Sequence, residues 1–88
     1  MTVLDYTTLS KSRQYAFRAG IFGATGANNS DRDLHRMCLE IKTFDVSELE
    51  ELPSFKRMAE LLGFERSAGY AIGTYLMACE QNHNEART

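Results

Sequence analysis

Two histidines and two cysteines have the spacing in this chain that best suits metal chemistry. They form the pairs His35-x-x-Cys38 and Cys79-x-x-x-His83, and each pair would place a nitrogen and a sulfur on one face of a helix. Four such ligands can hold zinc tetrahedrally. The spacing is not that of a standard zinc finger, however, and both cysteines fall on apolar stripes, which is typical of buried free thiols. We therefore expect no metal and no other cofactor, and we leave open whether the four residues converge.

Acid–base and nucleophilic chemistry find less support in the sequence. Carboxylates gather at Asp45, Glu48, Glu50 and Glu51, but a catalytic pair needs a pocket that shifts its pKa values. These residues suit instead the solvated first turn of a helix. No serine or cysteine is visibly paired with a histidine and an orienting carboxylate. We expect that the protein is not an enzyme.

The loop GATGANNS, residues 23–30, has a superficial likeness to a phosphate cradle because of its glycines. It lacks the dinucleotide-binding fingerprint and the lysine of a Walker motif, and no predicted strand precedes it. Glycine, asparagine and serine favour turns for reasons of backbone geometry alone. A loop without a nucleotide is therefore the interpretation that we adopt.

The elements that must position these residues are predicted to be helices. The chain has 88 residues, 43% of them hydrophobic, and one proline, which is the composition of a single globular domain. No strand-like alternation extends over a long stretch, so we expect an all-α fold, a compact bundle of four main helices plus one short helical turn. This domain covers residues 1–88, with frayed ends at 1–6 and 82–88. No apolar run approaches the ~20 residues of a membrane span and the first residues do not resemble a signal peptide, so we expect a cytoplasmic protein.

Capping residues and apolar spacing set the expected boundaries. Ser30 is a candidate N-cap that is followed by two aspartates in the first turn, and Gly63 suits the end of a helix. The short helical turn is predicted from Asp45 or Ser47 to Leu52. The main helices are predicted from Thr7 or Thr8 to about Phe22, from Ser30 to about Thr43, from Phe55 to Leu62 after a Ser54 cap, and from Glu65 or Arg66 to Gln81.

Residues 55–76 carry a local motif. Ala59 supplies a small residue and Gly63 a turn four residues later, and apolar residues surround both. The segment resembles a helix-turn-helix, the motif of many DNA-binding regulators. The resemblance implies a recognition helix at 65–74 that enters the major groove. The residues that it implies for contacts with DNA are Lys56, Arg57, Arg66, Ser67, Tyr70 and Thr74.

Two features depart from that motif. Gly69 stands where the motif normally has a buried, branched aliphatic residue. The net charge of −2 and the isoelectric point near 5.6 also count against a dedicated nucleic-acid-binding protein. DNA binding is therefore kept as the alternative function.

Gly69-x-x-x-Gly73 suggests a different use of the same helix. Each glycine costs ~1 kcal/mol relative to alanine within a helix, so the pair needs a compensating role. Either it packs closely within the chain, for instance against Ala16 and Gly20, or it lets a partner approach. Tyrosine and methionine are enriched in protein interfaces. The predicted protein-binding residues are Gly69, Tyr70, Gly73, Thr74 and Met77.

These observations favour a small, non-enzymatic regulatory protein. We expect that it docks on a partner protein and acts sterically, as an inhibitor or an adaptor. By analogy, mobile elements encode proteins of this kind. A helix-turn-helix transcriptional regulator is the alternative, and a homodimer is compatible with both. The sequence does not name the partner.

Overall fold

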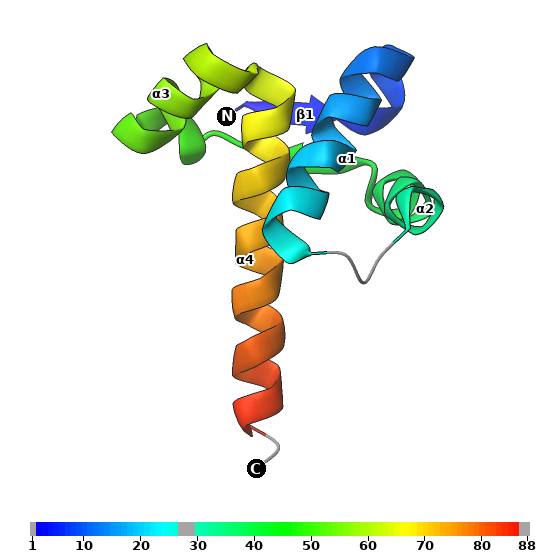
Figure 1. The fold of residues 1–88 in the computed structure, drawn as a ribbon, viewed down its shortest axis with the longest axis vertical. Helices are drawn as coiled ribbons and strands as arrows, with labels where there is room; N and C mark the ends of the chain where they lie inside the picture. Colours follow the sequence, from blue (N-terminus) through cyan, green and yellow to red (C-terminus); the bar gives the residue numbers. More distant parts are fainter. Residues whose placement is uncertain (1, 27–29, 87–88) are drawn as a thin grey trace.

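The protein is a helical bundle with a two-stranded sheet at one end of its long helix (Figure 1). The structure, a computed structural model, describes residues 2–26 and 30–86, the side chains of 79–86 excepted. The expected all-α architecture is confirmed. Along the chain the elements are β1 (Val3–Asp5), η1 (Tyr6–Thr8), α1 (Lys11–Thr25), α2 (Asp31–Ile41), β2 (Thr43–Asp45), η2 (Leu49–Glu51), α3 (Pro53–Leu62) and α4 (Phe64–Ala86), where η marks a 3₁₀ turn.

Serine caps and one glycine explain most helix boundaries. Ser30 caps α2, accepting a hydrogen bond from the backbone N–H of Asp33, as predicted. Ser10, rather than Thr7 or Thr8, caps α1, because Asp5 already holds residues 6–8 in their own turn. The Ser54 cap is also wrong, since proline can occupy the first position of a helix and α3 begins at Pro53. Gly63 ends α3 with a φ of 93°.

The first and last of the main helices, α1 and α4, extend past their predicted limits. α4 continues to Ala86 instead of ending near Gln81, and Figure 1 shows its C-terminal half projecting beyond the other elements. α1 likewise continues to Thr25, so the loop is shorter than 23–30. Residues 27–29 and 87–88, which belong to the predicted loop and the predicted frayed end, lie outside the described residues.

The small sheet was not predicted. β1 pairs with β2 in antiparallel register, with Leu4 opposite Phe44, and both side chains are buried. Tyr6 follows the first strand and is fully buried. The prediction of a frayed end at 1–6 is therefore wrong for residues 3–6. A strand of three residues is too short to show the alternation that reveals a longer one.

Glycines bring α1 and α4 into backbone contact. A Cβ atom added at Gly69 would lie 2.1 Å from the carbonyl oxygen of Phe17, and one added at Gly20 would lie 2.1 Å from that of Arg66. At Gly73 the nearest atom would be the Cβ of Ala24, at 2.9 Å. The intramolecular interpretation of the glycine pair is thus the one that the structure supports.

A single core lies among α1, α2, the sheet and the first turns of α4. Its buried hydrophobic residues are Leu4, Tyr6, Phe17, Ile21, Leu34, Cys38, Phe44, Val46, Phe55 and Ala68. Aromatic rings contact each other within it, with 4.9 Å between the ring centroids of Phe17 and Phe44. Across the described part of the chain, no helix combines the length and the apolar character needed to cross a bilayer.

Candidate functional site

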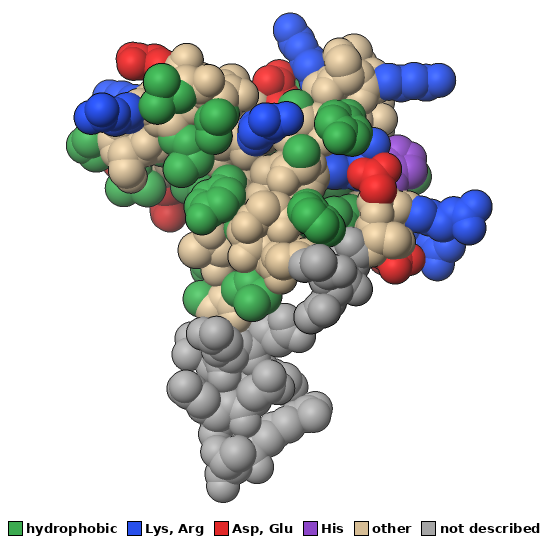
Figure 2. Space-filling view, in the orientation of Figure 1, with side chains coloured by type: hydrophobic (Ala, Val, Ile, Leu, Met, Phe, Trp, Pro, Cys, Tyr) green, Lys and Arg blue, Asp and Glu red, His purple; other side chains and the backbone are tan. Residues whose placement is uncertain are grey.

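An apolar groove lies where η2, α3 and α4 meet. It has a volume of about 380 Å³. α3 contributes Phe55 and Met58 to its lining, and α4 contributes Tyr70, Thr74 and Ala78 from successive turns. Figure 2 shows hydrophobic side chains gathered over α3 and the adjoining part of α4, with charged side chains at the margin. This groove is the candidate site for an apolar ligand or partner.

α3 lies across the start of α4 and covers only that part of it, which leaves the groove open (Figure 1). Phe55 and Phe64 meet edge to face, with 5.9 Å between ring centroids, and hold α3 against the start of α4. α3 has 10 residues and α4 has 23, so most of α4 extends past its shorter neighbour. Large apolar side chains remain exposed along the lining, including Leu52 at 48% and Tyr70 at 42%.

One polar atom at the groove lacks a hydrogen bond. Ser67 lines the groove and is 0% exposed. Its hydroxyl has no hydrogen-bond partner within the described part of the chain. Leaving a buried hydroxyl unpaired costs about 1–3 kcal/mol, and such groups are rare in folded proteins.

The groove continues into a second depression with an acidic end. This depression, of about 280 Å³, shares Leu49, Ala71 and Tyr75 with the groove and adds Asp45 and Glu48. The hydroxyl and the backbone N–H of Ser47 both donate to Asp45 Oδ1, at 2.7 and 3.0 Å. These hydrogen bonds lower the pKa of Asp45 below its usual value.

Of the predicted protein-binding residues, Tyr70 and Thr74 line the groove. Gly69 and Gly73 do not, because they are buried against α1, and the prediction that they receive a partner is corrected. Met77 is partly buried and lies outside the groove lining. The spacing of seven residues from Tyr70 to Met77 did not place both side chains at one site.

Of the residues that the helix-turn-helix resemblance implies for contacts with DNA, some are exposed, one is buried and two line the groove. Lys56, Arg57 and Arg66 are exposed on α3 and α4. Ser67 is fully buried, so its predicted contact with a DNA base is corrected. Tyr70 and Thr74 belong to the apolar groove, and the hydroxyl of Thr74 donates to the backbone carbonyl of Tyr70.

A polar cluster between α1 and α2 was missed. Arg18 donates through Nε to Asp31 Oδ1 and through Nη1 to the hydroxyl of Tyr6, both at 2.8 Å. The Tyr6 hydroxyl also lies 2.6 Å from Nδ1 of His35. Burial alone would lower the pKa of Arg18, but these hydrogen bonds outweigh it and raise the pKa. The signal in the sequence that could have indicated it is the group of cations Lys11, Arg13 and Arg18 within eight residues.

Of the four residues considered for zinc, the structure describes the side chains of His35 and Cys38. His35 is bonded to Tyr6, and Cys38 is fully buried in the core, where burial raises the pKa of its thiol to about 11. The side chains of Cys79 and His83 lie outside the described residues. Within the described residues, no group of three or more histidine, cysteine or acidic side chains could hold a metal ion.

Comparisons of the chain with protein-family models, with curated proteins and with solved structures found no match.

Proposed function

We propose that this chain is a small, non-enzymatic, cytoplasmic regulator that binds an amphipathic helix of a partner protein in the groove between α3 and α4. The observation that carries the proposal is the open apolar groove itself, along whose lining Leu52 and Tyr70 are 48% and 42% exposed. The mechanism is steric: while the groove holds the helix, that helix is unavailable to its other partners. Such a protein would serve as an inhibitor or as an adaptor.

The length of the groove supports a helical ligand. Its α4 lining runs from Ser67 to Ala78, which corresponds to about 16 Å along a helix axis. Three turns of an amphipathic helix have that length, and apolar side chains at i, i+4 and i+7 would face the groove. Tyr70 offers a broad ring that loses little conformational entropy on contact.

The acidic residues at one end of the groove suggest in which direction the partner helix lies in it. Asp45 and Glu48 are exposed beside the depression that continues the groove. A lysine or arginine at the corresponding end of the bound helix would pair with them. Such rim contacts contribute more to orientation and association rate than to affinity, so the apolar stripe provides most of the binding energy.

Selection from a displayed library of amphipathic helical peptides tests the proposal. Peptides recovered on the wild-type protein should bind Tyr70→Ala and Thr74→Arg at least ten times more weakly, because both changes alter the groove lining. Leu61→Ala is the matched control: Leu61 is 75% exposed and outside the groove, and its variant should bind within twofold of wild type. Circular dichroism should show the same helix content in all variants. Equal binding to all of them would refute the assignment.

DNA binding is the competing proposal. It is supported by the α3–Gly63–α4 arrangement and by the exposed cations Lys56, Arg57 and Arg66. Titration with random duplex DNA at low salt distinguishes the two functions, because contacts with phosphates give an affinity that falls steeply as salt rises. Micromolar binding that is lost in a Lys56→Gln, Arg57→Gln double variant would favour DNA. Sedimentation of the free protein would show whether a second copy fills the groove instead.

A further inference from the structure

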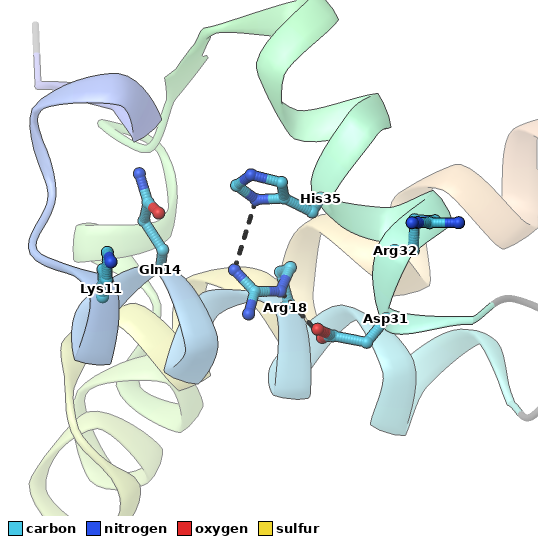
Figure 3. Close-up of a pocket in the computed structure, with 6 residues that line it drawn as sticks. All are labelled: Lys11, Gln14, Arg18, Asp31, Arg32 and His35. Carbon is cyan, nitrogen blue, oxygen red and sulfur yellow. Dashed lines mark hydrogen bonds and ion pairs between the residues drawn. The ribbon is translucent and has the colours of Figure 1, made fainter.

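Two further pockets adjoin one another on the α1–α2 side of the molecule. Both are lined by Arg18 and Asp31, so the two pockets meet at this ion pair. The first has a volume of about 420 Å³ and is polar (Figure 3), and its other lining residues are Lys11, Gln14, Arg32 and His35. The second has a volume of about 340 Å³, and its other lining residues are Tyr15, Ala19, Phe22 and Leu34.

The first pocket has an excess of positive charge. It is lined by three cationic side chains, Lys11, Arg18 and Arg32, and by one anionic side chain, Asp31, which leaves a net charge of +2. Arg18 is held in place because its side chain is only 12% exposed and is bonded on both sides. Figure 3 shows it between the two helices, with Asp31 on one side and His35 on the other. The cationic centre therefore exists before any ligand arrives.

His35 adds a hydrogen-bond donor to this pocket. Nδ1 of His35 lies 2.6 Å from the Tyr6 hydroxyl and 3.4 Å from Nη1 of Arg18. A guanidinium group has only donors, so the nitrogen that faces it must be an acceptor, and Nδ1 accepts the hydrogen of the Tyr6 hydroxyl. The other ring nitrogen, Nε2, consequently carries the imidazole hydrogen and can donate it to a ligand.

The second pocket adds an aromatic surface. Tyr15 and Phe22 are 57% and 43% exposed, and their spacing of seven residues puts them on one face of α1. The guanidinium carbon of Arg18 lies 5.8 Å from the centre of the Tyr15 ring. A flat apolar group could contact these rings while remaining next to the cationic pocket.

We propose that this face binds a small molecule in which a phosphate-class oxyanion is attached to a planar aromatic body. The oxyanion lies in the first pocket, among Lys11, Arg32 and the Nε2–H of His35. The aromatic body lies over Tyr15 and Phe22. Arginine and lysine donors bind phosphate oxygens through charge-assisted hydrogen bonds, and in this pocket the donors come from two helices, α1 and α2. This site shares no lining residue with the α3–α4 groove, so it is independent of the function proposed above.

Titration with phenyl phosphate, inorganic phosphate and adenosine 5′-monophosphate, followed by amide chemical shifts and calorimetry, tests the proposal. Phenyl phosphate should bind saturably and at least five times more tightly than inorganic phosphate. A higher affinity for the nucleotide than for phenyl phosphate would support the proposal and identify a nucleotide-like ligand, whereas the reverse order would support it and identify a simple aryl phosphate. No saturable change with any probe, or equal affinity for the two phosphates without a base, would overturn it.

Variants at exposed positions locate the binding. Lys11→Gln and Arg32→Gln should each weaken phenyl phosphate binding roughly tenfold, and Phe22→Ala should abolish the preference over inorganic phosphate. Arg36→Gln is the matched control, because Arg36 is exposed on α2, carries the same charge and lines neither pocket; this variant should bind within twofold of wild type. A loss in Arg36→Gln equal to that in Arg32→Gln would indicate attraction by net charge alone and would overturn the site.

Discussion

The two sides of α4 are built from opposite kinds of residue. Toward α1 the helix presents Gly69 and Gly73, whose missing side chains let the two backbones touch. Toward α3 it presents Tyr70 and Thr74, which line an open groove. Gly69 and Tyr70 are adjacent in the chain, but one residue turns a helix by about 100°, so Gly69 is buried against α1 while Tyr70 remains 42% exposed.

This difference separates architecture from recognition within one helix. The side without side chains is closed, because any added atom would meet backbone that has no room to move. The side with large side chains forms an open groove, with Tyr70 42% exposed, and it is the surface on which the proposed partner helix would lie. Small residues in a helix thus mark where the chain contacts itself in this protein, and the neighbouring aromatic residue marks the available surface.

The largest expected change in stability comes from adding side-chain atoms at the glycines between α1 and α4. Gly69→Ala and Gly20→Ala each place a Cβ atom 2.1 Å from a carbonyl oxygen of the facing helix, so α1 and α4 must separate. We expect the free energy of unfolding to fall by about 3 kcal/mol or more, which is the upper range for overpacked cores. Urea denaturation followed by circular dichroism measures the loss.

Gly23→Ala is the matched control for these variants. It lies in the same helix as Gly20, but its added Cβ would meet only the Tyr70 ring, at 3.7 Å, an ordinary contact. Alanine is the better helix former, so this variant should be more stable than wild type by roughly 0.5–1 kcal/mol. If Gly69→Ala and Gly23→Ala changed stability equally, the close contact between α1 and α4 would not exist in solution.

A smaller loss of stability should follow from ionising the thiol of Cys38, which is buried in the core. Burial raises the pKa of Cys38 to about 11, from about 9 for an exposed thiol. Above pH 9 the unfolded chain loses this proton while the folded chain keeps it. The stabilisation is therefore complete below about pH 9 and is lost as pH rises toward 11, by on the order of 2–3 kcal/mol.

Unfolding free energies measured between pH 8 and 11 for wild type and Cys38→Ala test this expectation. Burial also raises the pKa of Tyr6, which decreases stability in the same direction at higher pH, so a common background slope is expected. The additional slope should be present in the wild type and missing in Cys38→Ala. Identical slopes would mean that water reaches the thiol in the folded state.

The smallest expected change in the free energy of unfolding comes from replacing Ser67, which lies on α4 between the side that packs on α1 and the side that lines the groove. Ser67→Ala removes the buried hydroxyl that has no partner in the described structure, so it should increase the free energy of unfolding by about 1 kcal/mol. Ser54→Ala, at an exposed serine of the groove, should change it by less than about 0.5 kcal/mol. A destabilised Ser67→Ala protein would show that the hydroxyl is hydrogen-bonded in solution.

Local signals in the sequence predicted the helices well. Ser30 and Gly63 were identified as boundaries of α2 and α3 because capping depends on a few adjacent residues. The short strands were missed because Leu4 and Phe44 bury each other across 40 positions, and neither strand is long enough to show a pattern.

The candidate site was only partly predictable for the same reason. Tyr70 and Thr74 were chosen from the composition of α4, and both line the groove. The other wall of the groove is formed by Leu49 and Phe55, which pack against α4 from other elements. The spacing of apolar residues within α4 cannot predict that packing. The Tyr6–Arg18–His35 contacts join segments up to 29 residues apart, and a tyrosine in a short polar stretch gives no sign that it is buried.

The connection between α3 and α4 has a further consequence. Gly63 is the single residue between the two helices, and its φ of 93° is one that side-chain-bearing residues rarely adopt. Because no other residue links the two helices, a change in this one angle rotates the whole of α3 relative to α4. A substitution at position 63 would therefore change the width of the groove between α3 and α4 while every lining residue stays the same.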